Sequence, residues 1–392
     1  MKFICTQENL NKALTIVGKV VNKNSTLPIL NNVLLKTEKG MVKLSATNLE
    51  IGVSYYIGGI IEEKGEITIP TKLFANFISN LPAGNVEIKL REDVVNIKCN
   101  GYKTNIKGID AKEYPLTPKL DIEPVFKIKS SEFKKALTQV LPAISTSESR
   151  VEITGVFLNL AEIDKNILTL VATDSYRLAE KTLKLEKKDV AENYQDLLGN
   201  LQSIIIPKET VQELIRDISE EDDLVEIIIA DGQILFKFGN ASIISRLIEG
   251  KYPDYKQIIP TEFAFKINSE KNAAIKAIRV ASLFSNIANN SVEFKLSLNS
   301  KNLEINAETS ELGNNNTKIP VEIEINKEVM QKENTAKEGE ISIFYNHKSL
   351  IDGLNSVDGD SIFLKINDAN SPTVLVSAID SSFVYVIMPI RA

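Results

Sequence analysis

The chain repeats one series of predicted elements three times along its 392 residues. The first series begins at Phe3 with a short apolar strand, polar capping residues and then apolar residues spaced three and four apart. The same arrangement begins again at Phe126 and at Phe265. This pattern predicts a strand that leads into an amphipathic helix. Because a repeated pattern reflects a repeated structural unit, the sequence predicts three copies of one domain.

Two further elements recur in the same order within each third. A second strand followed by a helix and another strand occupies residues 67–88, 203–227 and 341–364. Between the two helical units lies a third matching segment, at 44–53, 170–179 and 305–314. The copies are spaced roughly 125 to 140 residues apart, and the constant order of three element types indicates a triplicated domain.

The chain ends in an apolar stretch, VYVIMPIRA at 384–392, although chain termini are usually polar and frayed. The first two thirds end in Glu-Tyr-Pro and Lys-Tyr-Pro, and strands that match the final one precede these tripeptides at 102–109 and 241–248. The final stretch is therefore expected to be a sheet strand of the third domain. Its two counterparts continue into a connector, whereas no such connector follows the final strand.

Short runs of alternating polar and apolar residues, such as VEIKLREDVVNIKC, accompany two predicted helices in each third. These runs are typical of hairpins, so the sequence predicts an α+β fold with antiparallel sheets rather than a doubly wound one. Proline-bearing connectors lie at 115–125 and 253–262. They divide the chain into predicted domains at 1–120, 121–255 and 256–392. The polar stretch 314–340 is expected to be a surface excursion.

Composition places the chain among globular proteins, with 43% hydrophobic and 25% charged residues. No apolar stretch approaches the roughly 20 residues that span a bilayer, and the start MKFICTQENL lacks the apolar region of a secretory signal. Cys5 and Cys99 lie in apolar alternations and are expected to be buried thiols. These features predict a cytoplasmic protein.

Motifs that carry chemistry are absent from the sequence. The single histidine, His347, is predicted in the first turn of a helix, and no nucleophile elbow, phosphate-binding loop, HExxH or paired CxxC motif occurs. The acidic run at 219–223 reads as a solvated turn. We therefore expect no catalytic residue, metal site or cofactor. A hydrolase that uses two carboxylates remains an alternative, because such a pair needs no motif.

The six predicted helices carry a net positive charge, although the chain as a whole is acidic. They hold twelve basic and seven acidic residues, a net charge of +5 in a chain whose net charge is −6. The basic residues are Lys12, Lys19, Lys23, Lys72, Lys134, Lys135, Lys208, Arg216, Lys271, Lys276, Arg279 and Lys348. Helix faces are often charged, and such an imbalance also arises by chance. A repeated positive face would suit the phosphates of a nucleic acid, bound without base readout.

Several segments together resemble one known family. They are STLPILNNVLL (25–35), SATNLE (45–50), SRVEITGVFLN (149–159), ATDSYRLA (172–179), YPDY (252–255) and the terminal VYVIMPIRA. Over its whole length the chain is similar to the bacterial sliding clamps, the beta subunits of DNA polymerase III. The combination of ATDxxRLA at mid-chain with a terminal MPxR is the most specific part of this resemblance.

The resemblance implies a head-to-tail homodimer that forms a ring of six similar domains, with twelve helices facing the hole. Double-stranded DNA would pass through the ring without sequence-specific contacts. The implied partners are the polymerase III alpha subunit, the clamp loader, and mismatch-repair proteins and other polymerases that carry short peptide motifs. The family has no chemistry of its own and serves as a processivity factor in DNA replication.

The resemblance also implies two sets of site residues. A pocket for partner peptides would comprise Arg150, Ile153, Thr173, Tyr176, Arg177, Leu178, Pro253, Ile258, Val386, Ile387, Met388, Pro389, Ile390 and Arg391. The subunit interface would pair a first-domain edge strand, with Thr104 and Ile106, against the first helix of the third domain, with Ala273 and Ala274. Such a pocket is apolar with arginines at its rim, and it suits leucine or phenylalanine anchors with a polar or acidic flank.

Two departures from the family pattern fall in this pocket. Family members usually end in leucine after MPxR, whereas this chain ends in Ala392, which is expected to thin an apolar wall. Many members have Gly-His at the positions of Ser175 and Tyr176, and the bulkier pair is expected to narrow the groove. Both departures affect the predicted peptide preference rather than the role. A monomeric interaction scaffold of three domains remains an alternative from another class.

Overall fold

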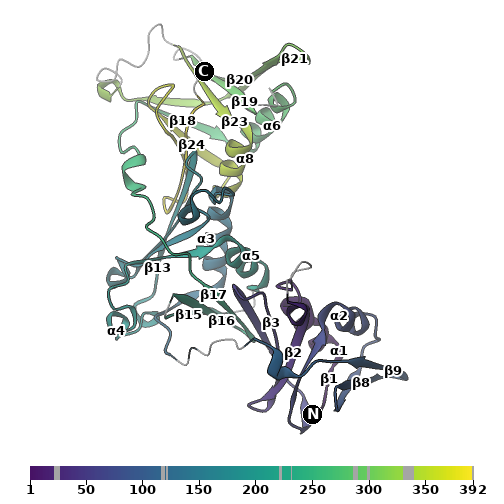
Figure 1. The fold of residues 1–392 in the computed structure, drawn as a ribbon. Helices are drawn as coiled ribbons and strands as arrows, with labels where there is room; N and C mark the ends of the chain where they lie inside the picture. Colours follow the sequence, from purple (N-terminus) through teal and green to yellow (C-terminus); the bar gives the residue numbers. More distant parts are fainter. Residues whose placement is uncertain are drawn as a thin grey trace. The chain divides into compact units, whose positions relative to one another are not determined.

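The computed structural model describes residues 1–21, 27–115, 120, 122–219, 223–230, 232–285, 290–297, 301–329 and 340–390. The chain forms two compact units, and the second third contributes to both. The N-terminal unit comprises Met1–Lys134, Glu186–Leu201 and Gln212–Leu247. The C-terminal unit comprises Lys135–Leu185, Gln202–Val211 and Ile248–Ala392. Figure 1 labels many of the helices and strands of both units.

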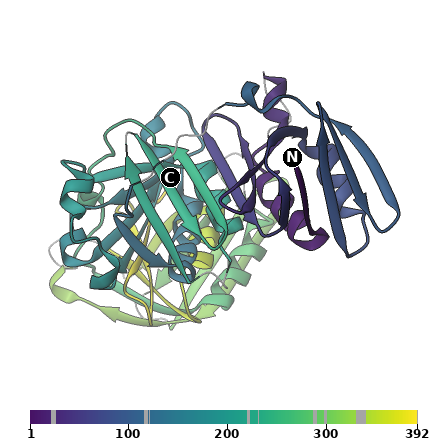
Figure 2. The same cartoon turned by 90° about the horizontal axis from the view of Figure 1, so that it is seen from below.

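The first third contains two helices among nine strands in the described residues. Its elements are β1 (Lys2–Thr6), α1 (Gln7–Val17), η1 (Pro28–Asn31), β2 (Asn32–Glu38), β3 (Met41–Thr47), β4 (Ile51–Ile57), β5 (Ile60–Glu63), β6 (Glu66–Pro70), α2 (Thr71–Ser79), β7 (Asn85–Arg91), β8 (Val94–Cys99), β9 (Tyr102–Lys107) and η2 (Ala111–Glu113). In Figure 2, β1 lies beside the N label among the purple-to-blue strands of this third.

The second third has the same plan and one additional short helix, α4, that the sequence did not predict. Its elements are β10 (Phe126–Lys129), α3 (Ser130–Val140), η3 (Leu141–Ala143), η4 (Val151–Ile153), β11 (Gly155–Asn159), η5 (Ile163–Lys165), β12 (Ile167–Thr173), β13 (Arg177–Lys184), η6 (Lys187–Asp189), α4 (Tyr194–Leu198), β14 (Ser203–Pro207), α5 (Lys208–Asp217), β15 (Leu224–Ala230), β16 (Gln233–Phe238), β17 (Ala241–Arg246) and η7 (Lys256–Ile258).

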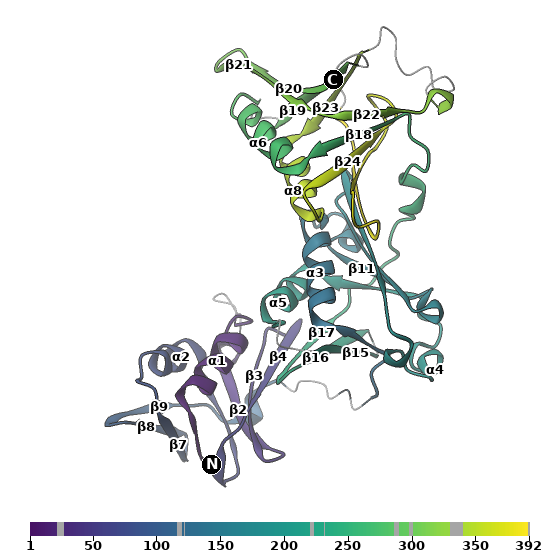
Figure 3. The same cartoon turned by 180° about the vertical axis from the view of Figure 1, so that it is seen from behind.

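The last third again carries two long helices in its described residues. Its elements are β18 (Phe265–Glu270), α6 (Lys271–Ser282), β19 (Ser291–Ser297), β20 (Asn302–Thr309), β21 (Gly313–Pro320), β22 (Glu322–Ile325), β23 (Glu340–Asn346), α8 (His347–Ser356), β24 (Ser361–Ile366), β25 (Thr373–Ser377) and β26 (Phe383–Ile387). Helices α6 and α8 lie side by side, as Figures 1 and 3 show from opposite sides.

All six helices predicted from the sequence are present. In α1, Leu10, Leu14 and Val17 are buried at the predicted 3–4 spacing, and the Thr6 side chain caps the helix by accepting from the Asn9 amide. The bounds correct one assignment, because α1 ends at Val17 and Lys19 lies beyond it rather than on the helix. Lys23 lies outside the described residues.

The described strands form four sheets, and their paired strands run antiparallel, which confirms the predicted α+β class. The strand orders are β5-β1-β7-β8-β9 and β10-β15-β16-β17-β4-β3-β2-β6 in the N-terminal unit, and β14-β11-β12-β13-β26-β25-β24-β18-β22 and β21-β20-β19-β23 in the C-terminal unit. Two strands from different thirds therefore share a sheet twice, as β17 with β4 and as β26 with β13. The final strand is a core element, as the repeat predicts.

The predicted excursion at 314–340 is wrong over its first part. Residues 314–320 belong to β21 and residues 322–325 to β22, and the later residues 330–339 lie outside the described part. The polarity of the asparagine run at 314–316 suggested a loop, but an outer strand exposes much of its length and tolerates polar residues. Cys5 and Cys99 are buried free thiols, as predicted. No helix in the described residues is long and apolar enough to cross a membrane.

Candidate functional site

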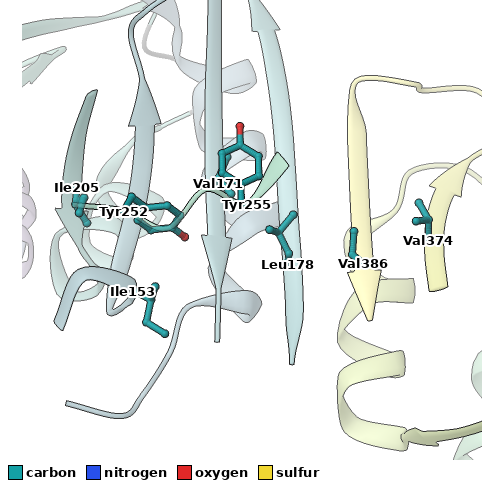
Figure 4. Packing of buried hydrophobic residues seen from close by; sticks show 8 residues of the cluster. All are labelled: Ile153, Val171, Leu178, Ile205, Tyr252, Tyr255, Val374 and Val386. Atoms are coloured by element: carbon teal, nitrogen blue, oxygen red, sulfur yellow. The ribbon is translucent and has the colours of Figure 1, made fainter. Parts of the chain in front are cut away.

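The C-terminal strand joins the segment 172–179 through backbone hydrogen bonds. Strand β26 pairs with β13, with Val386 opposite Leu178 (Figure 4). Beyond the strand, the Met388 amide donates to the Tyr176 carbonyl over 2.8 Å. The Ile390 amide then donates to the Phe344 carbonyl over 2.7 Å. The end of the chain is thus fixed between the turn after β12 and the edge strand β23.

A buried apolar cluster lies beneath this junction. Its buried members are Ile153, Val171, Leu178, Ile205, Tyr252, Tyr255, Val374 and Val386, shown in Figure 4. The half-buried Phe157 stacks on Tyr252, with 4.6 Å between ring centroids. Because these residues come from five strands, η4 and the connector after β17, the cluster holds the separate parts of the surface in register.

The structure gathers the predicted pocket residues at the junction, but it exposes them unequally. Ile153, Thr173, Leu178, Val386 and Ile387 are buried, and they support the surface from beneath. The half-buried residues are Arg177, Pro253, Met388, Pro389 and Ile390. Tyr176 is 75% exposed and Ile258 44% exposed, so their side chains are the apolar groups that a partner can reach. Arg391 lies outside the described residues.

The turn between β12 and β13 is held by its own side chains. The Thr173 hydroxyl donates to the Arg177 carbonyl over 2.7 Å and accepts from the Ser175 amide. Asp174 Oδ1 accepts from the amides of Tyr176 and Arg177. Ser175 has a φ of 78°, a conformation that glycine adopts more readily than serine.

The two predicted rim arginines have different surroundings. The half-exposed Arg150 donates from Nε to Glu152 over 3.0 Å and from Nη1 to the Ser175 hydroxyl over 3.2 Å. Arg177 is only 15% exposed and forms ion pairs with Asp174 and Asp352. Burial alone would lower the pKa of Arg177, but the hydroxyl of Tyr385 and the two carboxylates raise it. Arg177 is therefore permanently charged.

Sequence reasoning missed Asp352 and Tyr385 as parts of this site. Asp352 lies on α8, and Tyr385 lies in the middle of β26. Asp352 is 175 positions from Arg177 in the chain, so no local pattern connects the two. The available signal was weak: in the apolar stretch 383–387, Tyr385 is the residue that carries a hydroxyl.

Five of the predicted basic residues are exposed on helices and form no ion pair with another described residue. They are Lys12 on α1, Lys72 on α2, Lys276 and Arg279 on α6, and Lys348 on α8. Lys208, at the start of α5, is half-buried and likewise forms no ion pair within the described part. These side chains remain available to an external anion.

The other described basic residues contact groups within the chain. Lys19 pairs with the buried Asp217 over 2.8 Å, and Lys135 pairs with Asp358 over 2.6 Å. Arg216 pairs with Glu213. The ammonium groups of Lys134 and Lys271 donate to the carbonyls of Ile218 and Val357, which follow α5 and α8. These contacts engage the positive groups within the chain rather than offer them to a ligand.

The predicted interface residues lie on one outer strand and one helix. Strand β9 is the outer strand of its sheet, with Thr104 half-buried and Ile106 buried against its own domain. On α6, Ala273 is half-buried and Ala274 is buried. The side chain of Ile106 therefore faces inward, and the strand can offer a partner its backbone edge. Groups of three or more His, Cys, Asp or Glu that could hold a metal are absent from the described residues.

Comparison with known proteins decides the family. Residues 1–118, 127–254 and 256–391 match the family models described as the N-terminal, central and C-terminal domains of the DNA polymerase III beta subunit. The chain is 30% identical to the beta sliding clamp of Halalkalibacterium halodurans, covering 100% of both chains. The chain belongs to the bacterial beta sliding clamp family.

Further relatives of this sliding clamp agree with the assignment. The beta sliding clamp of Staphylococcus aureus is 29% identical, covering 100% of the chain and 99% of the relative. The crystal structure of the DNA polymerase sliding clamp from Bacillus subtilis covers 100% of this chain and 99% of its own, at 27% identity and a TM-score of 0.89. A Pseudomonas aeruginosa clamp bound to griselimycin is 25% identical, with a TM-score of 0.87 and full coverage of both chains.

Membership confirms the predicted family, the fold of three clamp domains and the function. The protein is a sliding clamp of DNA replication, the processivity subunit that tethers polymerase III. The predicted fold class includes ring formation as a dimer, which agrees with the clamp family.

Proposed function

We propose that two copies of this clamp join head to tail and encircle duplex DNA without reading its sequence. The ring performs no chemistry. It tethers the polymerase III alpha subunit, the clamp loader, mismatch-repair proteins and other polymerases through short peptide motifs. One observation carries this proposal. Two pairs of strands from different thirds join edge to edge within the chain, and β9 and β21, the strands that would form a third pair of this kind, lie at outer edges of their sheets.

The two internal junctions have the same form. Strand β4 pairs with β17, with Val53 opposite Ile243. Strand β13 pairs with β26, with Ala179 opposite Tyr385. In the threefold repeat, β4 and β13 correspond to β21, and β17 and β26 correspond to β9. Strands β21 and β9 are the outer strands of their sheets, so a third junction of this form requires a second copy of the chain.

The repeat also gives the register of this third junction. The turns that precede β4, β13 and β21 can be aligned. In this alignment Asn314 of β21 corresponds to Val53 of β4 and to Ala179 of β13. Counted from the hairpins that precede β9 and β17, Thr104 takes the position of Ile243. Thr104 of one subunit is therefore expected opposite Asn314 of the other. Ala273 and Ala274 of α6 would lie at the same interface, as we proposed from the resemblance.

Native mass tests the dimer. The chain mass is 43.5 kDa, and we expect a particle of twice that mass in native mass spectrometry at micromolar concentration. A monomer at this concentration would support the interaction-scaffold alternative instead.

The exposed basic residues of the helices are proposed to contact DNA phosphates. Lys12, Lys72, Lys208, Lys276, Arg279 and Lys348 are the strongest candidates, because they form no ion pair within the described residues. Phosphate contacts without base contacts bind DNA but do not fix a position along it, which sliding requires. Lys19, Lys134, Lys135, Arg216 and Lys271 are weaker candidates, because acidic or carbonyl groups of the chain already engage them.

Charge reversal separates this helix face from the rest of the surface. Changing Lys12, Lys276 and Lys348 to Glu is expected to reduce loading or retention on DNA at least tenfold while leaving peptide binding unchanged. Changing the exposed Lys39, Lys64 and Lys187 to Glu alters the net charge equally at positions off the long helices, and it is the matched control. Equal effects of the two triple variants would contradict the assignment.

The surface around β13 and β26 is proposed to bind partner peptides. Its support is that the Met388 amide donates to the carbonyl of the exposed Tyr176, and that the exposed Arg150 donates to Ser175 in the same turn. Deleting residues 388–392 removes the hydrogen bonds to Tyr176 and Phe344 and is expected to abolish peptide binding. The native mass of the deletion variant should remain that of the dimer. Loss of the dimer instead would place the subunit interface here.

Domain limits and compartment complete the proposal. We retain limits at 1–120, 121–255 and 256–392, which the three family matches support. A replication clamp works on the chromosome, so we propose a cytoplasmic location. The two-carboxylate hydrolase has no observation in its favour.

A further inference from the structure

The guanidinium of Arg177 is engaged by three groups of its own chain. Its Nε donates to Asp174 Oδ2 over 2.9 Å, and its Nη1 donates to Asp352 Oδ2 over 2.6 Å. Nη1 also lies 3.4 Å from the hydroxyl of Tyr385. With the side chain only 15% exposed, two carboxylates already surround this one positive charge. A partner carboxylate would have to compete with both of them.

On one side, this network fixes the turn that holds the end of the chain. The same Asp174 that accepts from Arg177 Nε also accepts from the backbone amides of Tyr176 and Arg177, through its other oxygen. The Tyr176 carbonyl in turn accepts from the Met388 amide. Three hydrogen bonds, through Asp174 and Tyr176, therefore connect the Arg177 side chain to the backbone of Met388.

On the other side, the network is anchored to helix α8. Asp352 belongs to α8, and the Tyr385 hydroxyl donates to the carbonyl of Ser349 on the same helix over 2.9 Å. The helix approaches Tyr385 so closely that a Cβ atom at Gly353 would lie 2.5 Å from the ring. Arg177 and Tyr385 thus connect the turn, strand β26 and α8 in one packed arrangement.

Arg150 differs from Arg177 in its exposure and in the number of its N–H groups that donate to no described residue. Its side chain is 47% exposed and has one carboxylate neighbour, Glu152. Two of its five N–H groups donate to Glu152 and Ser175, and the other three donate to no described residue. Arg150 can therefore donate to both oxygens of a carboxylate from outside, whereas Arg177 would first have to lose a partly buried ion pair.

We infer that Arg177 is a positioning residue, which fixes the turn and Met388 from α8, and that Arg150 determines the preference of the surface for acidic peptides. This inference rests on the proposed peptide-binding function of the surface. It assigns Asp352, a residue of α8, to the peptide site. It also separates the two arginines that the family pattern groups together at the rim.

Two peptides that differ by one charge test the inference. The probes are acetylated, amidated Leu-Asp-Leu-Phe and Leu-Asn-Leu-Phe, with dissociation constants measured by calorimetry on the full chain at low salt. We expect the wild type to prefer the Asp peptide by about two- to fivefold, as an exposed charge pair allows. In Arg150→Met this ratio should fall to about one, with the affinity for the Asn peptide nearly unchanged.

Asp352→Asn gives the most direct test, because the two roles of Arg177 predict opposite signs. If Arg177 positions the turn, this substitution weakens both peptides by a similar factor, about threefold or more, and leaves their ratio unchanged. If Arg177 were a docking cation, removing its competing carboxylate would strengthen binding of the Asp peptide alone. That result would overturn the inference.

Controls separate folding and the proposed function from this inference. Asp164→Asn makes the same charge change at an exposed position on η5, outside the predicted pocket, and should leave both affinities unchanged. The double variant Arg177→Met with Asp352→Asn leaves no carboxylate of α8 unpaired and should weaken both peptides as Asp352→Asn does. Melting temperatures establish that each variant folds. A wild type that binds neither peptide would overturn the proposed surface itself, and the inference with it.

Discussion

Ser175 occupies the left-handed backbone region at the tip of the turn beside the chain end, with a φ of 78°. For residues other than glycine this conformation costs about 1–2 kcal/mol, and β-branched residues tolerate it least. We expect Ser175→Val to lower the free energy of unfolding by about 1–2 kcal/mol, and Ser175→Gly to change it by less than about 0.5 kcal/mol. Urea denaturation measures both.

A strand serine provides the control for this prediction. Ser203 in β14 is half-buried in an extended strand, where valine is favoured, so Ser203→Val should not destabilise. If Ser175→Val and Ser203→Val had the same effect, backbone strain at Ser175 would not be the cause.

Gly353 shows how one absent methyl group determines the packing of a helix. Alanine inside a helix is usually more stable than glycine by about 1 kcal/mol. At Gly353 the added Cβ atom would meet the Tyr385 ring at 2.5 Å, and overpacking of this kind costs about 1–3 kcal/mol. We therefore expect Gly353→Ala to lower the melting temperature.

Removing the ring should reverse this effect. In a Tyr385→Leu background, Gly353→Ala should stabilise the protein or leave it unchanged, because the ring atoms that it meets are gone. Stabilisation by Gly353→Ala in the wild type would contradict the close packing of α8 on β26.

At the residue scale, the sequence predicted which residues belong to the candidate peptide surface, but not which side chains contact one another. The segment 172–179 and the terminal MPxR identified Thr173, Leu178 and Met388, and the structure brings these together. The separate environments of Arg150 and Arg177 were not predictable, because the carboxylate that distinguishes them, Asp352, is distant in sequence.

Among the elements, the junction of β13 with the turn before β26 contains a buried lysine. Lys181 is 5% exposed and donates to Asp380 and to the Ser382 hydroxyl, each over 2.7 Å. Partial burial would raise the pKa of Asp380, but hydrogen bonds from Lys181 and Ser382 outweigh it and hold the pKa well below its ordinary value. This carboxylate is therefore ionised in the folded protein throughout the neutral range.

The low pKa predicts a pH dependence of stability. A carboxyl group whose pKa is lower in the folded state stabilises the fold above its unfolded pKa of about 4, and the contribution is lost as the pH falls towards the folded pKa. Asp380→Asn should therefore lower the free energy of unfolding by about 2 kcal/mol at pH 7, and the difference from the wild type should shrink below about pH 4. A difference that is constant from pH 7 to pH 3 would contradict this account.

The turn before β13 has a close counterpart before β4. Thr47, Asn48 and Leu49 reproduce the contacts of Thr173, Asp174 and Ser175, including side-chain hydrogen bonds to the same relative amides. Leu49 even has nearly the same φ, 79°. The repeat could therefore be predicted down to a turn, because Thr-Asn and Thr-Asp dictate the same local hydrogen bonds.

Element boundaries were less predictable than element types. The end of α1 at Val17 and the strand β21 were both missed. In each case a polar or basic residue was assigned to a helix or to a surface excursion from the polarity of its sequence neighbours. Packing against the sheet, however, decides where a helix or an outer strand ends.

For the whole molecule, the register proposed for the subunit interface is directly testable. Cysteines placed at Thr104 and Asn314 should form a crosslink between subunits, since Cβ atoms directly opposite in antiparallel strands lie about 4.5–5.5 Å apart. The native thiols should not interfere, because both are buried and burial raises the pKa of the Cys5 thiol to about 12. A short bismaleimide and denaturing electrophoresis measure the yield.

A shifted pair tests whether this crosslink reports the register. Cysteines at Lys107 and Asn314 would be three residues out of register and should crosslink poorly. Equal yields from the two pairs would contradict the proposed pairing of β9 with β21.

The whole-molecule arrangement follows from repetition more than from any single site. Three copies of one domain, with outer strands left at β9 and β21, favour an assembly that closes on itself. The sequence could predict the copies because their patterns recur. It could not predict which lysines face an external anion, because Lys19 and Lys135 find partners from distant parts of the chain.

Retention on closed DNA tests the central claim most directly. After loading by a clamp loader onto a nicked circular plasmid, the labelled protein should elute with the DNA in gel filtration and be lost once a restriction enzyme linearises the plasmid. A ring held by topology predicts this difference even at a salt concentration that weakens phosphate contacts. Equal loss from circular and linear DNA would contradict the account of a clamp that encircles its template.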